Sequence, residues 1–172
     1  MALETILLAV GNRDETRVEQ LTSTAVELAE PVDALVTVAH VVPAESGTIS
    51  ESALPIAGQH RPTVLSDDEY DDVLDRSEIA DADGSDVDDA ITRHETVRAV
   101  VDRLESSGVT AETRGVIGDS GEALVTLARE SDADRIVIGG RHRSPTDKVV
   151  FGSVAQDVLL SAPCPVTFVR DA

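Results

Sequence analysis

Short continuous runs of apolar residues, separated by a stretch with helical periodicity, restrict this chain to few folds. Residues 6–10 and 34–42 are two such runs, the second interrupted only by Thr37 and His40, and runs of this length are typical of strands buried on both faces. Between them, apolar side chains recur at helical spacing over residues 14–30, and Pro31 ends that pattern. Strand, helix and strand in this order form a βαβ unit, whose crossover is right-handed.

The same alternation returns after residue 90. An apolar stripe with i, i+3, i+4, i+7 spacing predicts a helix over residues 97–104 that stops near Gly108. Residues 109–116 place polar side chains on one face, which favours a strand at the edge of a sheet. The other predicted elements are strands over residues 135–138 and 166–169, and helices that begin at Asp119, with capping-box spacing to Glu122, and at Gly152. The sequence therefore predicts an α/β fold: an open doubly wound five-stranded parallel sheet with helices on both faces.

A long segment over residues 43–90 interrupts the alternation. It is rich in Pro and Gly at first and then acidic, with 12 carboxylates and one Arg over residues 67–89. Such a composition buries too little apolar surface to order the backbone. We expect one domain over residues 1–172 that carries a flexible acidic insertion at about 43–90.

The charge and the residue usage exclude several classes of protein. A net charge of −19 argues against nucleic-acid partners and against anionic membrane surfaces. No apolar run approaches the length of a membrane span, and the single cysteine, Cys164, fits a reducing compartment, so we expect a cytoplasmic protein. With 14 Lys and Arg of which only Lys148 is lysine, and few aromatic residues, the composition favours a halophilic protein with an aliphatic core. An ordinary acidic protein with one acidic loop is the alternative.

The segment over residues 139–153 carries the clearest indication of a binding site. It leaves a buried strand and enters a helix through Gly152 and Ser153, and the N-terminus of a helix attracts phosphate. Ser153 either caps that helix or turns its hydroxyl to a ligand, and Gly139 and Gly152 permit a close backbone approach. Four basic side chains lie between them in a strongly acidic chain: Arg141, His142, Arg143 and Lys148. An anionic ligand explains this local excess of positive charge, and loop salt bridges are the alternative.

The same segment resembles the C-terminal signature of the universal stress protein family. In that signature Gly, two residues, Gly, nine residues and Gly-Ser bind ATP phosphates and ribose. Here Gly139 and Gly152-Ser153 match at the family's spacing, while His142 stands at the place of the middle glycine. The closing Ala-Pro-Cys-Pro-Val stretch is similar to the family too. The resemblance implies a Rossmann-like fold of the adenine-nucleotide alpha-hydrolase type with strand order 3-2-1-4-5, and ATP with Mg²⁺ as the cofactor.

The resemblance also implies which residues form the site. In nucleotide-binding members an Asp follows the first strand, and here Gly11 takes its place. Val41, at the end of the second strand, matches the position whose backbone meets adenine. The implied site residues are Gly11, Val41, Gly139, Arg141, His142, Arg143, Gly152, Ser153 and Val154. The last strand, Pro165 to Val169, is the edge through which the family forms homodimers.

Three functions remain open from the sequence. The first is a stress-response regulator that binds ATP or another phosphate-bearing ligand, with at most slow hydrolysis. The second is a dimeric interaction protein of the same fold that binds no nucleotide, because both Gly11 and His142 depart from the family pattern. The third is an enzyme of another α/β class, for which the sequence indicates no nucleophile or base.

Overall fold

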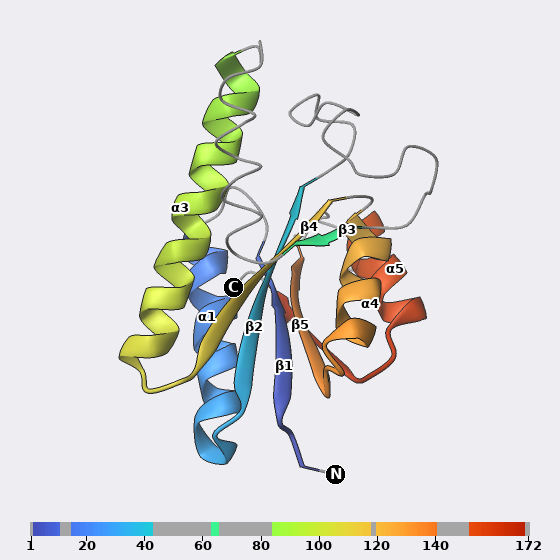
Figure 1. The fold of residues 1–172 in the computed structure, drawn as a ribbon. Helices are drawn as coiled ribbons and strands as arrows, with labels where there is room; N and C mark the ends of the chain where they lie inside the picture. Colours follow the sequence, from blue (N-terminus) through green and yellow to red (C-terminus); the bar gives the residue numbers. More distant parts are fainter. Residues whose placement is uncertain are drawn as a thin grey trace, which may run out of the picture.

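Five parallel strands form the centre of the computed structural model, which describes residues 2–10, 15–42, 63–65, 84–117, 120–140 and 152–170. The parallel strands are β1 (Thr5–Ala9), β2 (Leu35–Val42), β4 (Ala111–Ile117), β5 (Arg135–Gly140) and β6 (Val166–Arg170). They lie side by side as β4-β2-β1-β5-β6 (Figure 1). Counted along the chain, this is the order 3-2-1-4-5, so the predicted sheet is confirmed.

The sheet has one strand more than predicted. Strand β3 (Thr63–Leu65) pairs antiparallel with Gly115–Ile117 of β4, so the prediction of a free edge at residues 109–116 is wrong for that end of the strand. Alternating polarity reports which face of a strand meets solvent. It carries no information on whether the backbone groups along the edge are paired, because those groups point sideways within the sheet.

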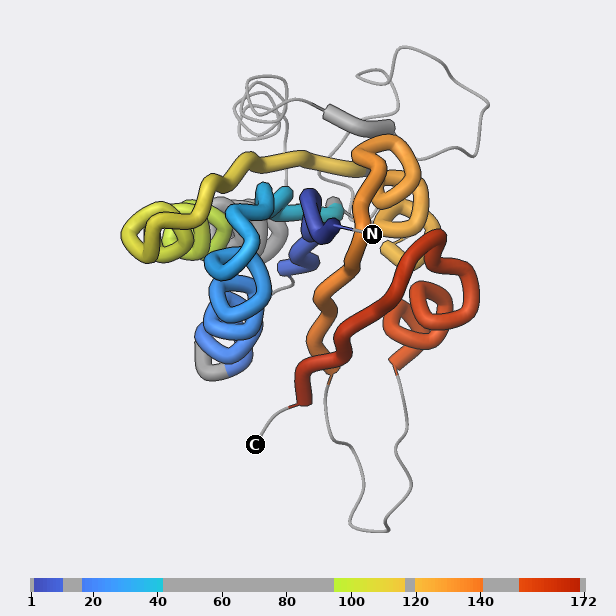
Figure 2. The backbone as a smooth tube through the Cα atoms, turned by 90° about the horizontal axis from the view of Figure 1, so that it is seen from below, coloured from blue at the N-terminus to red at the C-terminus, as the bar shows by residue number. Residues whose placement is uncertain are grey.

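Helices cover both faces of the sheet, as predicted. On one face lie α1 (Glu15–Ala29), followed by the short 3₁₀ turn η1 (Glu30–Val32), and α3 (Gly84–Ser106). On the other face lie α4 (Ser120–Glu130) and α5 (Ser153–Ser161). Figure 2, a view of the molecule from below, shows α1 and α3 on one side and α4 and α5 on the other.

Two elements fall within residues 43–90, where the sequence predicts a flexible insertion: strand β3 and the first turns of α3. The other residues of that segment lie outside the described ranges. The apolar stripe at 97–104 predicted only the end of α3, whose first residues belong to the segment predicted as an acidic insertion. The helix stops where expected, with Gly108 in the left-handed region at φ 80° and the N–H of Val109 donating to the carbonyl of Leu104 at 3.0 Å.

The core is aliphatic and consists of two clusters, one on each face of the sheet. Every buried hydrophobic residue of the described ranges is Ile, Leu, Val or Ala, as the scarcity of aromatic residues predicted. The cluster under α1 and α3 includes Val10, Leu21 and Val137, whereas the cluster under α4 and α5 includes Ala39 and Ile138. Membership in one cluster or the other shows which pair of helices a residue near the carboxyl ends of the strands faces.

Candidate anion-binding site

The candidate site lies where β1 and β5 end. The two strands are neighbours, but the chain passes from β1 to α1 on one face and from β5 to α5 on the other. Such a change of winding direction leaves a crevice at the carboxyl ends of the strands, where ligands bind in open α/β sheets. Because α5 leads from β5 to the parallel strand β6, its first turn lies at this same end. The topology therefore brings Gly139 and Gly152 to one end of the sheet, as the sequence predicted.

The first turn of α5 is built to present backbone N–H groups. Gly152 is the N-cap, with φ −62° and ψ 160°, and no side chain caps the helix. A Cβ placed on Gly152 would meet no atom within 4 Å. Ser153 is the first helical residue, so the alternative in which its side chain caps the helix is wrong. Gly152, Ser153 and Val154 are all exposed, which leaves this turn accessible to an anion.

Gly139 has a neighbour that the sequence did not predict. A Cβ at this position would lie 2.9 Å from Cδ and 3.2 Å from Cγ of Arg17, and 3.2 Å from Cδ1 of Leu21, both on α1. The next residue, Gly140, leaves its own Cβ position to the ring of Phe168 on β6. The paired glycines at the end of β5 thus make room for one side chain on each face. The sequence predicted a close approach at Gly139 and Gly152, but not which residues approach Gly139.

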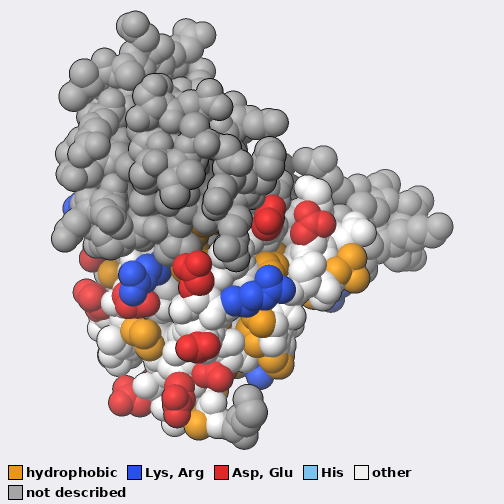
Figure 3. Space-filling model, turned by 45° about the vertical axis from the view of Figure 1, so that its right-hand side comes forward, with side chains coloured by type: hydrophobic (Ala, Val, Ile, Leu, Met, Phe, Trp, Pro, Cys, Tyr) orange, Lys and Arg blue, Asp and Glu red, His pale blue; other side chains and the backbone are white. Residues whose placement is uncertain are grey.

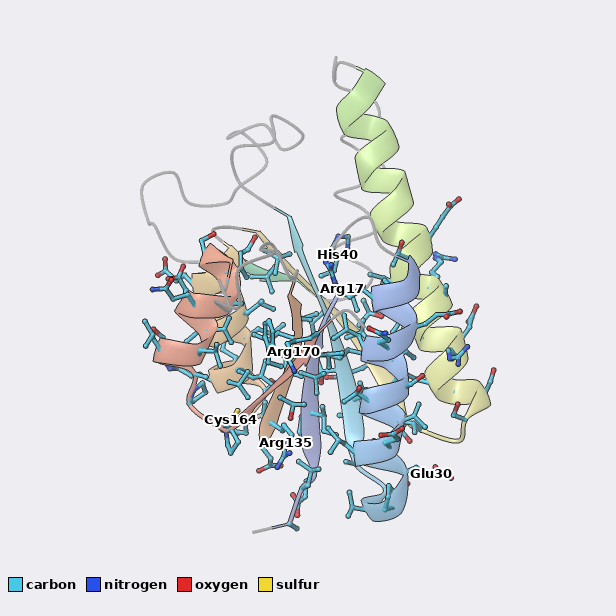
Figure 4. All side chains as sticks on the ribbon, turned by 180° about the vertical axis from the view of Figure 1, so that it is seen from behind. Arg17, Glu30, His40, Arg135, Cys164 and Arg170 are labelled. Carbon is cyan, nitrogen blue, oxygen red and sulfur yellow. The ribbon has the colours of Figure 1, made fainter. Side chains whose placement is uncertain are left out.

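The strand register places Arg17 in a defined neighbourhood. Ala9 pairs with Ala39, and Ile6 pairs with Arg135, so Val10, His40 and Gly139 form one row across β1, β2 and β5. All three face α1 and α3, and His40 is only 2% exposed. Figure 4 shows Arg17 and His40 at this same end of the sheet.

The remaining implied residues divide into two groups. Val41 lies at the end of β2, level with Val116 of β4, and packs partly buried against the cluster under α4 and α5. Strand β2 is the neighbour of β1 in the sheet, so Val41 lies at the same carboxyl end as the candidate site. Gly11, Arg141, His142 and Arg143 lie outside the described residues.

Arginine side chains lie at the carboxyl end of the sheet in a chain that is otherwise strongly acidic. The chain carries a net charge of −19, and Figure 3 shows acidic side chains spread over the side that bears α4 and α5. At the carboxyl end the structure places Arg17 beside Gly139, and Arg170 pairs with Gly140 at the exposed end of β6. Positive charge at this end favours a phosphate or carboxylate ligand.

Other chemistries find little support among the described residues. Within those ranges no three His, Cys, Asp or Glu side chains gather as a metal site would require. Burial raises the pKa of the partly buried Cys164 thiol, and the charge of Asp134 raises it further, so Cys164 lacks the character of an activated nucleophile. No helix of the described ranges combines the length and apolar character that crossing a bilayer requires.

Comparison with known proteins points to one family. The profile of the Universal stress protein family matches residues 2–170. A universal stress protein of Mycolicibacterium smegmatis is 44% identical over 85 residues, which cover 49% of this chain and 65% of that relative. The matched part of the chain thus spans less than two thirds of that relative's length.

Solved structures share the fold over nearly the whole chain. The structure of a universal stress protein from Archaeoglobus fulgidus is 26% identical, with a TM-score of 0.64 and 98% of each chain covered. A structure of the universal stress protein from the same organism in complex with dAMP is 25% identical, with a TM-score of 0.60 and the same coverage.

Proposed function

The chain belongs to the universal stress protein family, and we propose that it is a stress-response regulator that binds an adenine nucleotide where β1 and β5 end. The observation that carries the proposal is the exposed first turn of α5, whose N-cap is a glycine and which lies at the carboxyl end of the sheet, as the switch point does. The complex of a similar protein with dAMP supports adenine as the base.

In this proposal the implied residues act in four groups. The backbone of Val41 meets the base, and Gly152, Ser153 and Val154 offer the helix N-terminus to the phosphates. Arg141, His142 and Arg143 supply positive charge from the loop, and Gly139 and Gly11 line the crevice. We propose ATP with Mg²⁺ as the ligand. The metal would be held by the phosphate oxygens, since Gly11 offers no carboxylate for it.

Ligand-dependent unfolding tests this function directly. The melting temperature of the full chain would be measured with ATP, ADP, AMP and adenosine, each with and without Mg²⁺. At a hundredfold excess over the dissociation constant, a bound nucleotide stabilises the protein by about 2.7 kcal/mol. Purified protein would also be checked for bound nucleotide by mass spectrometry. No stabilisation by any of these ligands, together with no co-purified nucleotide, contradicts the proposal.

The second candidate function is an interaction protein that acts as a homodimer. It is favoured by the edge position of β6 and by the partial exposure of its apolar side chains. This strand lies at the end of the sheet order, and its apolar residues Val166, Phe168 and Val169 are only partly buried. Leu160 on the neighbouring α5 is 78% exposed. Pairing of Pro165 to Val169 with a second copy would cover this edge. Light scattering on the full chain tests it, and a monomer at micromolar concentration contradicts it.

We also propose that the protein works in the cytoplasm of a cell with concentrated salt. Support comes from the net charge of −19, from Lys148 as the only lysine, and from a lone thiol in place of any disulfide. At 1 M salt the Debye length is about 3 Å, so repulsion among the surface carboxylates is screened.

A further inference from the structure

The contact between Arg17 and Gly139 assigns a role to a residue that the sequence analysis passed over. The stem of Arg17 occupies the space that a side chain at position 139 would need, at 2.9 and 3.2 Å from the position of its Cβ. Leu21, one turn further along α1, closes the same space at 3.2 Å. Gly139 therefore provides a slot that holds the stem of Arg17 across the end of β5.

The slot lies beside the crevice of the candidate site. Gly139 is level with Val10, the residue after β1, and neighbouring strands are about 4.8 Å apart. The Cγ and Cδ atoms of Arg17 thus lie within one or two strand spacings of the switch point between β1 and β5. Figure 4 shows it at the carboxyl end of the sheet.

The stability of α1 does not explain an arginine here. Arg17 is the third residue of the helix, in the first turn, where the helix dipole is positive and a carboxylate is preferred. Arginine in this turn adds to the positive potential of the helix N-terminus instead of offsetting it. A stem packed against Gly139 and a position in the positive first turn together indicate that the guanidinium serves something other than the helix dipole.

We infer that Arg17 is a specificity-determining residue, which makes the site prefer phosphate-bearing nucleotides over the neutral nucleoside. This inference rests on the proposed nucleotide binding. The guanidinium has five N–H donors in a planar fork, so it can bind a phosphate oxygen alongside another partner. Gly139 then has a role apart from the ligand, because it holds the stem that aims the guanidinium.

Paired ligands and paired variants test the role of charge. Affinities for AMP and for adenosine would be measured by calorimetry for the wild type, Arg17→Met and Arg17→Lys. Methionine keeps an unbranched stem in the slot and removes the charge, whereas lysine keeps the charge. We expect Arg17→Met to weaken AMP binding by about 10-fold to 100-fold and adenosine binding by less than about 2-fold. Arg17→Lys should retain part of the preference.

The matched control is Arg103→Met, which removes the same charge from the last turn of α3, at the other end of the sheet. It should leave both affinities unchanged. If Arg17→Met binds AMP as the wild type does, the arginine only packs against β5 and the inference is overturned. An equal loss for AMP and adenosine also overturns it, because a general distortion of the site then explains the result.

A separate measurement covers the case in which the wild type binds none of ATP, ADP, AMP and adenosine and carries no co-purified nucleotide. That outcome refutes the proposed function, and the inference then depends on inorganic phosphate as the probe. Stabilisation of the wild type by phosphate that is lost in Arg17→Met, but not in Arg103→Met, supports the anion-binding role without a nucleotide. No response of the wild type to phosphate overturns the inference as well.

The role of Gly139 can be tested with a double-mutant cycle. Gly139→Ala should displace the flexible stem of Arg17 and weaken AMP binding in the wild-type background. In the Arg17→Met background, where the charge is already absent, it should cause no further loss. An equal loss in both backgrounds would show that the glycine contacts the ligand itself, against the slot proposed for Arg17.

Discussion

Replacing Gly152 by Asp should stabilise the protein and at the same time remove its binding of anions. The structure gives the reason for the first effect. Gly152 is the N-cap of α5 in an extended conformation, φ −62° and ψ 160°, that any residue adopts. No side chain caps the helix, and a new Cβ meets no atom within 4 Å. Aspartate therefore fits without strain, and its carboxylate can accept hydrogen bonds from the unpaired N–H groups of the first turn.

The size of this stabilisation follows from two contributions. Exchanging Gly for a good N-cap residue is worth a few tenths of a kcal/mol, and a carboxylate at a helix N-terminus adds about 0.3–1 kcal/mol. Together they amount to about 0.5–1.3 kcal/mol. For a chain of 172 residues this corresponds to a rise in melting temperature of roughly 1–5 °C.

The effect on binding has the opposite sign. A carboxylate that is hydrogen-bonded to the unpaired N–H groups competes with a phosphate for these donors. Its negative charge also repels the phosphate. Gly152→Asn is the matched control, because it caps the helix with the same shape and no charge. The asparagine variant should gain a few tenths of a kcal/mol and keep measurable binding, whereas the aspartate variant should bind no nucleotide.

Both quantities would be measured for the three proteins in one buffer of fixed salt, because salt screens the interaction with the helix dipole. Unfolding without ligand gives the stability, and calorimetry with ATP gives the affinity. The reasoning is refuted if Gly152→Asp is less stable than the wild type, or if it binds ATP as tightly as Gly152→Asn.

Three further predictions concern stability. Gly121→Ala places a Cβ 2.7 Å from that of Asp157, so it should separate α4 from α5 and cost about 1–3 kcal/mol in denaturant unfolding; an unchanged midpoint contradicts this. The backbone N–H groups of Glu4 and Thr5 donate to Asp134 at 2.9 and 3.0 Å and lower its pKa. The stabilisation by Asp134 is therefore present above its unfolded pKa and lost as pH falls through its folded pKa. Asp134→Ala should be less stable than the wild type at pH 7 and should lose less stability on acidification. Urea unfolding of both proteins at a series of pH values tests this. Transfer from about 2 M KCl to dilute buffer should unfold the protein, and a folded, monodisperse protein by circular dichroism and light scattering in dilute buffer contradicts the halophilic proposal.

The sequence by itself determined the class of fold and the end of the sheet where the candidate site lies. Continuous apolar runs such as 6–10 and 34–42 report burial on both faces, and this is a local property that a parallel sheet requires. The strand order came from the family resemblance and is confirmed by the structure. Gly152 and Ser153 marked the start of α5 correctly for the same reason, since helix starts are encoded by neighbouring residues.

Only the tertiary structure decided what lies against those elements. The pairing of β3 with β4, the slot for Arg17 at Gly139 and the ring of Phe168 over Gly140 all join residues that are distant in the chain. A local pattern shows that a glycine permits a close approach, but the identity of the approaching group depends on how whole helices and strands are packed. For that reason the sequence located the candidate site, whereas the arginine that we infer to select its ligand became visible only in the folded chain.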